Sequence, residues 1–274
     1  MQALSASRIC FLAALLAFAL TAAAIRTSGQ SSRTEREFAP SESLQPFQPL
    51  ASGDQIFADL VKHNEVRDAG LREYSVVRTY AVTDLDGKVQ AQETVRMDYV
   101  APDRKKFVTI AEAGSAAVRH LALNRLMESE ASAVAGQDHR DSSISPANYG
   151  FRALGEEDLG NRHCFVVEAL PKRKDKYLFE GKLWIDSSEF AVVKIVGHPV
   201  KNPSFWITRA DFVREYEKIG DFWLPASDET FVEVRIYGKR ILSIKYHIDS
   251  VNGVMSTVLA GQKSSTGDFF VSRP

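Results

Sequence analysis

The sequence predicts an α+β fold in which a curved antiparallel sheet forms an incomplete β-barrel and about two helices cover its concave face. Between Lys176 and Val251, strand-length segments with a two-residue hydrophobic period follow one another, separated by turn residues and without a helical interruption. Such alternation is typical of antiparallel strands with one buried and one solvated face. Elsewhere only two segments have helical periodicity, so these are expected to cover the buried face.

The first helical segment opens the folded part of the chain. Ser52-Gly53-Asp54-Gln55 has the form of a capping box. The residues Ile56, Phe57, Leu60 and Val61 then form an apolar stripe, which predicts a helix ending near Gly70. Strands are predicted over 74–82, around 95–99, over 106–111 and over 162–170. The second helix is predicted over 116–135, where Val118, Leu121, Leu126 and Ala131 share one side.

The N-terminal segment is typical of a secretory signal peptide. Residues 1–24 carry one charge, Arg8, before an apolar run from Ile9 to Leu20 and the small residues Ala22-Ala23-Ala24. That run is shorter than the roughly 20 apolar residues of a membrane-spanning helix. We expect a cleaved signal and a periplasmic location; the alternative is an uncleaved anchor.

The remaining boundaries follow from composition. Residues 25–51 are rich in Ser, Gln, Glu and Pro, which predicts a flexible linker. The folded domain is expected over 52–252, and residues 253–274 form a mobile tail. Cys164 is the only cysteine after the signal segment and lies within an apolar strand, which predicts a buried, inert thiol. With 34 basic and 35 acidic residues, the chain lacks the basic excess of nucleic-acid-binding proteins.

Sequence signatures of catalysis are missing. The chain contains no G-x-S-x-G, H-E-x-x-H, Walker or G-x-G-x-x-G motif. Its six histidines are scattered, so neither a metal site nor a cofactor is expected. The loop over 137–150 holds His139 and Asp141 beside serines, but neighbouring residues on a loop rarely point at one another as a triad requires.

The inward sides of the predicted strands supply candidate ligand contacts. The expected apolar lining is Val76, Tyr80, Met97, Phe107, Phe165, Phe179, Leu183, Phe212 and Ile244. Either helices cover this surface completely and it is an ordinary core, or they leave a cavity that an apolar ligand fills. Arg78 shares a face with Val76 and Tyr80. Its charge there requires a partner or a polar opening, unless the side chain reaches water at the strand end.

Several motifs carry a family resemblance. They are Ser145-Pro146-Ala147-Asn148-Tyr149, Lys176-Tyr177-Leu178-Phe179, Leu183-Trp184-Ile185-Asp186, Asn202-Pro203-Ser204-Phe205-Trp206 and Phe222-Trp223-Leu224-Pro225. With them the chain resembles the LolA-like periplasmic superfamily from about Gly53 to Val251, and within it an uncharacterised branch labelled outer membrane lipoprotein-sorting protein. The resemblance implies a half-barrel wrapped round lid helices and no catalysis. In the carrier of that superfamily an inward arginine tethers the lid, and Arg78 best matches that position.

These observations together predict a protein that is not an enzyme. We expect it to bind an acyl chain or a lipoprotein-like apolar ligand in the half-barrel, for envelope lipoprotein or lipid transport. Its partners would be a lipid or an acylated protein and envelope proteins, with transient membrane contact, and it would be a monomer. The alternative is a ligand-free envelope sensor or assembly module, marked by Trp184 on the polar face of its strand. An exported hydrolase is a third reading and would need His139 and Asp141 to meet a serine.

Overall fold

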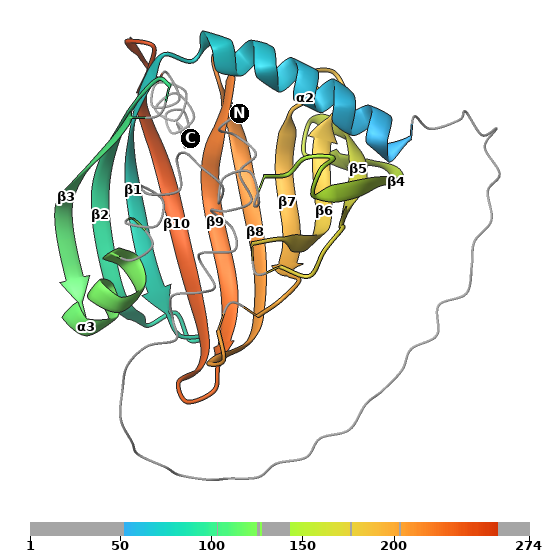
Figure 1. Ribbon diagram of the computed structural model, residues 1–274. Helices are drawn as coiled ribbons and strands as arrows, with labels where there is room; N and C mark the ends of the chain where they lie inside the picture. Colours follow the sequence, from blue (N-terminus) through green and yellow to red (C-terminus); the bar gives the residue numbers. More distant parts are fainter. Residues whose placement is uncertain are drawn as a thin grey trace, which may run out of the picture.

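An eleven-stranded antiparallel sheet, open at both edges, makes up most of the described chain, and two helices pack on it (Figure 1). The computed structural model describes residues 52–102, 104–124, 127, 143–175, 177–202 and 204–256. The helices are α2 (Gly53–Gly70) and α3 (Ala116–Val118), which continues as the π-helix η2 (Arg119–Asn124). The strands are β1 (Glu73–Thr83), β2 (Val89–Val100), β3 (Arg104–Gly114), β4 (Tyr149–Leu159), β5 (Arg162–Pro171), β6 (Phe179–Asp186), β7 (Val192–Pro199), β8 (Ile207–Ile219), β9 (Phe222–Val234), β10 (Gly238–Val251) and β11 (Val254–Met255). The predicted fold class is confirmed. The signal and linker predicted over residues 1–51 lie outside the described residues.

Two meanders lying side by side form the sheet. Neighbouring strands follow the order β3-β2-β1-β10-β9-β8-β7-β6-β5-β4, with β11 beside the end of β10. Along this path only β1 and β10 are neighbours in space without being consecutive in sequence. Their register runs from Tyr74 opposite Val251 to Thr83 opposite Ile241. This long-range pairing places the first three strands against the last ones in a single curved wall.

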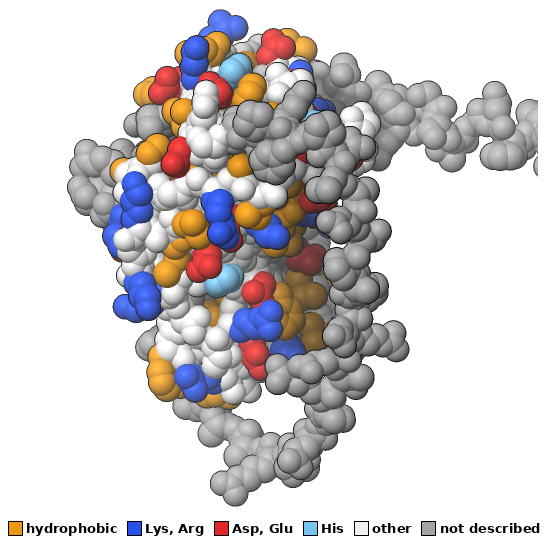
Figure 2. Space-filling model, turned by 90° about the vertical axis from the view of Figure 1, so that its right-hand side faces the viewer, with side chains coloured by type: hydrophobic (Ala, Val, Ile, Leu, Met, Phe, Trp, Pro, Cys, Tyr) orange, Lys and Arg blue, Asp and Glu red, His pale blue; other side chains and the backbone are white. Residues whose placement is uncertain are grey.

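Alternating burial divides the sheet into two faces. In β1 every second residue from Tyr74 to Val82 is buried, and β2 repeats this period from Ala91 to Tyr99. Both helices pack on this side, around which the sheet curves, and we call it the inner face. On the surface seen from the side of β4 to β6, acidic and basic side chains are intermixed rather than gathered by sign (Figure 2).

Helix α2 begins and ends as its sequence predicts. The Ser52 hydroxyl accepts a hydrogen bond from the backbone amide of Gln55 at 3.2 Å, which caps the first turn. Phe57 stacks on Phe151 of β4 with ring centroids 3.7 Å apart. A Cβ on Gly53 would lie 2.6 Å from the backbone of Phe151, so only glycine permits this approach. The helix therefore lies tightly on the inner face near β4.

The second helix differs from the prediction. Instead of a regular α-helix, α3 passes at once into η2, in which hydrogen bonds skip one more residue than in an α-helix. Val118 of α3 and Leu123 of η2 both pack against the inner face of β1, β2 and β10. The rest of the predicted helix lies, except for Met127, outside the described residues.

The strands depart from the predictions at two places, and β9 contains an irregularity. Strand β9 runs through Pro225, and a bulge at the next residue, Ala226, interrupts its pairing with β8. Strand β4 is not among the predicted strands, since after Phe151 none of its residues is buried and no alternation marks it. Beyond the expected boundary at residue 252, β11 adds a short pairing to β10.

Candidate functional site

A row of polar side chains crosses the inner face near the middle of four adjacent strands. Arg78 of β1 lies opposite Tyr246 of β10, and Asp228 of β9 lies opposite Arg214 of β8. The side chains of Arg78, Asp228 and Arg214 are only 2%, 4% and 4% exposed. We call Arg78, Tyr246, Asp228 and Arg214 the polar row. Charged groups so deeply buried require partners, and Arg214 and Asp228 are partners of each other within the row.

Asp228 is the centre of the polar row. Its carboxylate accepts hydrogen bonds from Nε and Nη2 of Arg214, the second at 2.6 Å, and from the Tyr246 hydroxyl at 2.6 Å. Burial alone would lower the pKa of Arg214, but the charge and hydrogen bonds of Asp228 hold that pKa well above its usual value. Burial and the charge of Asp228 also raise the pKa of Tyr246 well above 10. Both groups therefore keep their protons at neutral pH.

Arg78 lies among aromatic rings. Its guanidinium carbon is 5.2 Å from the ring centroid of Tyr246 and 5.8 Å from that of Phe107. Its Nη1 donates a hydrogen bond to the Tyr80 hydroxyl at 3.3 Å. Aromatic faces attract a cation and offset part of the cost of burying it. The guanidinium thus stays on the apolar side of β1 and does not reach water at the strand end.

A buried carboxyl group lies one step away along the sheet. Glu93 of β2 lies opposite Tyr80, and its Oε1 accepts a hydrogen bond from the Thr109 hydroxyl at 3.0 Å. Its Oε2 has no hydrogen-bond partner within the described part of the chain. Burial raises the pKa of Glu93, and the hydrogen bond from Thr109 opposes that rise. The inner face therefore favours the protonated form of this side chain more than water does.

The predicted lining residues divide among three apolar clusters. The upper cluster contains Val76 and Met97 with Tyr74, Tyr99, Ile219, Leu224, Ile248 and Val251. The lower cluster contains Tyr80 and Ile244 with Val82, Val95, Leu123 and Leu242. The helix cluster contains Phe179, Leu183 and Phe212 with Ile56, Phe57 and Leu60 of α2 and others. Phe107 is half-buried and packs on both the upper and the lower cluster, and Phe165 packs partly on the helix cluster.

This division narrows the candidate site. Phe165, Phe179, Leu183 and Phe212 pack with α2 and form an ordinary core. The other predicted lining residues belong to the upper and lower clusters, which flank the polar row. The candidate site is therefore the inner face of β1, β2, β9 and β10, between α2 and η2.

Arg67 of α2 holds the helix to the turn between β6 and β7. Arg67 donates hydrogen bonds to the backbone carbonyls of Glu189 at 2.8 Å and Phe190 at 2.7 Å, in the turn between β6 and β7. The Glu189 carboxylate in turn accepts from Trp223 Nε1 at 2.9 Å and from Lys218 Nζ at 2.6 Å. The turn is thus fixed to β8 and β9, and Arg67 latches the helix onto it.

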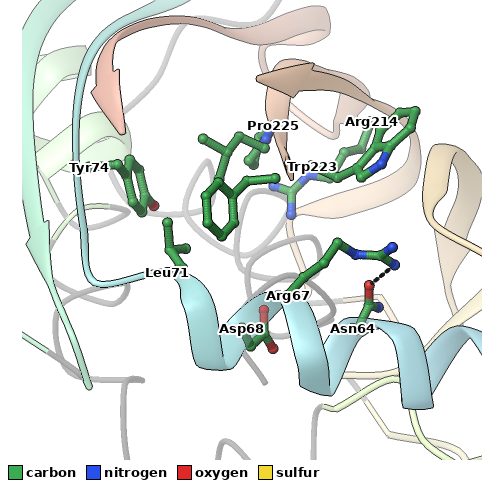
Figure 3. A pocket seen from close by; sticks show the side chains of 10 residues that line it. Asn64, Arg67, Asp68, Leu71, Tyr74, Arg214, Trp223 and Pro225 are labelled. Carbon is green, nitrogen blue, oxygen red and sulfur yellow. Dashed lines mark hydrogen bonds between the residues drawn. The ribbon is translucent and has the colours of Figure 1, made fainter. Parts of the chain in front are cut away.

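A small pocket lies beside this latch. Side chains from the end of α2 and from β8 and β9 enclose about 40 Å³, which is room for about three water molecules (Figure 3). Arg214 lines the pocket and belongs to the polar row, so the two are continuous. Arg67 is turned toward Asn64, whose Oδ1 accepts from Nη2 at 2.6 Å. The pocket thus lies at the contact between α2 and the sheet.

Two arginines thus have different surroundings. Arg78 contacts Tyr80, Phe107 and Tyr246, which lie on the sheet. The contact between α2 and the turn comes from Arg67, on the helix itself. The tether role of Arg78 stays a prediction, whereas the latch at Arg67 is a feature of the structure.

Sequence reasoning missed four polar residues of the inner face. Arg214 continues the alternation of Ala210 and Phe212, and both Asp228 and Thr230 precede Val232 at the same spacing. The argument that points Arg78 inward applies to them equally. Glu93 could have been found in the same way, from its spacing to Val95 on β2.

Trp184 and Cys164 lie on the outer side of the sheet. Trp184 is half-buried, its Nε1 donates to Glu157 at 2.8 Å, and the ammonium of Lys194 lies 5.9 Å from its ring centroid. Trp184, which would mark an interaction module, therefore already contacts Glu157 and Lys194 of the same chain. Cys164 is buried, as predicted, and burial raises its pKa to about 11.

Further features bear on catalysis and on membranes. Within the described ranges no group of three or more His, Cys, Asp or Glu side chains could hold a metal ion. His139 and Asp141 lie outside those ranges. Among the described helices, none combines the length and the apolar character that crossing a membrane requires.

No protein-family model and no curated protein sequence matches the chain. Its structure is similar to a DUF1329 family protein from Desulfovibrio piger, at 12% identity over 78% of this chain and 98% of that one, with a TM-score of 0.39. It is also similar to an outer membrane lipoprotein-sorting protein domain from Vibrio parahaemolyticus (11%, 75% and 96%, 0.40) and to a LolA superfamily protein from Nitrosomonas europaea (12%, 72% and 92%, 0.36).

Proposed function

We propose that this chain is an exported, non-enzymatic protein that binds an acyl chain, or a similar apolar ligand with a polar end, on the inner face between α2 and η2. A lipid or an acylated protein would supply such a ligand. One observation carries the proposal: two apolar clusters flank a buried polar row outside the core that α2 fills.

The apolar clusters provide the driving force. Each methylene group transferred from water contributes about 0.8 kcal/mol, so about ten buried methylenes contribute about 8 kcal/mol. That corresponds to micromolar affinity before ordering costs are subtracted. Val76 and Met97 above the polar row, and Tyr80 and Ile244 below it, are buried side chains that such a chain would contact.

The polar row suits the other end of an amphiphile. Arg78 places a positive charge among aromatic rings within an apolar wall. A carboxylate, phosphate or ester oxygen at this level would accept hydrogen bonds from the guanidinium. A plain hydrocarbon offers the guanidinium no such acceptor and would bind less well.

Helix α2 would serve as the lid. Its latch consists of two hydrogen bonds from Arg67 to backbone carbonyls, which water can replace when the helix moves away. The pocket beside the latch lies at the seam where such a movement would begin. Ligand exchange would then need no change within the sheet.

Catalysis is not part of the proposal. Arg214, Asp228 and Tyr246 are bonded to one another, and the raised pKa values keep Arg214 and Tyr246 protonated. Neither can act as a base at neutral pH. A periplasmic location, envelope partners and a monomeric state complete the proposal, and the location rests on the signal pattern of residues 1–24.

Native mass spectrometry of protein purified from its own host, followed by organic extraction, tests this function. We expect a co-purifying amphiphile that is released on unfolding. Absence of any bound lipid, together with no uptake of a fluorescent fatty acid, would contradict the proposal.

A further inference from the structure

Exposed apolar side chains project from the lower end of β8 and β9. Phe205, just before β8, is 71% exposed, and Ile236, in the turn between β9 and β10, is 55% exposed. Trp206 and Tyr237 beside them are half-buried and pack on the ends of these strands. We call Phe205, Trp206, Ile236 and Tyr237 the tip. Neighbouring apolar side chains exposed to this degree mark interaction sites.

Arg235 joins the two segments of the tip. Its Nε donates to the Phe205 carbonyl at 2.8 Å, and its backbone amide donates to the Trp206 carbonyl at 2.9 Å. Its guanidinium carbon also lies 4.6 Å from the Phe205 ring centroid, and the Phe205 and Trp206 rings meet edge to face. The exposed side chains are therefore held in place rather than carried on a loose loop.

The tip has a basic surround. The segments 200–206 and 235–240 contain the four cationic residues Lys201, Arg235, Lys239 and Arg240 and no acidic residue. Lys201 and Lys239 are exposed. This composition differs from the mixed charge of the surface seen in Figure 2.

Few acidic residues lie near this end of the sheet. Asp211 pairs with Arg209, and Glu233 lies opposite Arg209 and also opposite Lys239, so it offsets part of the basic charge. In the turn between β1 and β2, the Asp84 carboxylate accepts hydrogen bonds from the backbone amides of Asp86 and Lys88. The segments that form the tip therefore carry four cationic side chains, and the nearest carboxylate in the strand registers is that of Glu233.

We propose that the tip docks this protein on an anionic phospholipid surface. Aromatic side chains are enriched at the headgroup level of bilayers, where an apolar ring can enter while basic neighbours meet lipid phosphates. A protein partner fits less well, because two projecting side chains fall far short of the roughly 800 Å² per partner that a stable protein interface buries. This inference concerns the outside of the molecule and does not depend on ligand binding to the inner face.

Vesicle co-sedimentation of the full chain tests the inference. The parent is compared with Phe205→Ser/Ile236→Ser and with a control, Val66→Ser/Leu154→Ser, that removes exposed apolar side chains from α2 and β4. On vesicles of phosphatidylethanolamine and phosphatidylglycerol, we expect the tip variant to bind about tenfold less than the parent. The control should bind like the parent. Any binding through other segments is common to all three proteins.

A second experiment tests whether the basic side chains contribute to vesicle binding. Lys201→Gln/Lys239→Gln should weaken binding to the same vesicles by about tenfold, and added salt should weaken the parent similarly. Vesicles of phosphatidylcholine should bind the parent far less. Equal binding by parent and tip variant, or equal binding to both kinds of vesicle, would overturn the proposal.

A third measurement uses the unaltered protein, so its result does not depend on whether the tip variant folds. Phospholipids brominated on their acyl chains should quench tryptophan fluorescence, and Trp206→Phe should abolish the quenching. Absence of quenching in the parent would overturn the proposal. So would concentration-dependent self-association that the tip variant loses, because a second copy of the chain would then be the partner.

Discussion

Arg214 and Asp228 lie opposite each other on β8 and β9 and form a two-point ion pair inside a mainly apolar face, each only 4% exposed. Removing two charges from water is costly, and the cost is offset only when geometry and further hydrogen bonds are good. Here the Tyr246 hydroxyl supplies the additional bond to Asp228. The pair fixes where the polar row crosses the inner face.

Breaking the pair between Arg214 and Asp228 should strongly destabilise the folded protein. Asp228→Asn leaves the Arg214 charge buried without its counter-ion, so we expect the free energy of unfolding to fall by about 3 to 5 kcal/mol. The matched control is Asp211→Asn, which breaks an exposed pair with Arg209 on β8 and should cost less than about 1 kcal/mol. Urea denaturation measures both. Similar losses in the two variants would contradict the role of Asp228.

The latch of α2 can be tested separately. Arg67→Met removes two hydrogen bonds to backbone carbonyls and should lower the local stability of α2 by about 2 to 3 kcal/mol. Lys62→Met on the exposed side of the same helix is the control. Hydrogen exchange measured on α2 peptides should accelerate only in Arg67→Met. Unchanged exchange in that variant would show that the helix is held by its apolar side alone.

Glu93 should make stability depend on pH. Burial raises its pKa above the ordinary value of 4.5, so the native state binds this proton more tightly than the unfolded state. Stability therefore falls as pH rises from about 4.5 through the folded-state pKa. Glu93→Gln should remove this decline, and Thr109→Val, which deletes the opposing hydrogen bond, should extend it to higher pH. Chemical denaturation across this range decides, and an unaltered profile in Glu93→Gln would contradict the assignment.

The Cys164 thiol should be inert in the folded protein. Burial raises its pKa to about 11, so almost none is present as the reactive thiolate at pH 8. We expect no iodoacetamide label on the Cys164 peptide in native protein and complete labelling in urea, measured by peptide mass spectrometry. Rapid native labelling would show that strand β5 opens readily.

The periodic parts of the fold could be predicted from the sequence, and the irregular parts could not. Alternation identified the inward sides of β1, β2, β6 and β10 because each of these strands has one wet face. Strand β4 was not predicted, because only Tyr149 and Phe151 are buried in it and no repeating pattern follows. Proline is rare inside a strand, so the sequence does not show that β9 continues through Pro225 and the bulge at Ala226 beside it.

The candidate site was predictable in outline. The inward position of Arg78 follows from the period of β1 alone, and the same rule would have placed Arg214 and Asp228. Their pairing depends on the β8–β9 register, which a bulge shifts between Glu215 and Tyr216 and which no sequence period reveals. The Arg67 latch joins residues more than a hundred positions apart, through backbone carbonyls that carry no sequence signature.

The central claim is that the inner face above and below the polar row binds an amphiphile. Titration with a fluorescent fatty acid tests it most directly, using two variants of β1: Val76→Gln on the inner face and Val77→Gln on the outer face. A polar group in the apolar wall costs about 1 to 3 kcal/mol, so Val76→Gln should weaken binding by about tenfold or more. Val77→Gln should bind like the parent. No uptake by the parent, or equal affinity in all three proteins, would contradict the account.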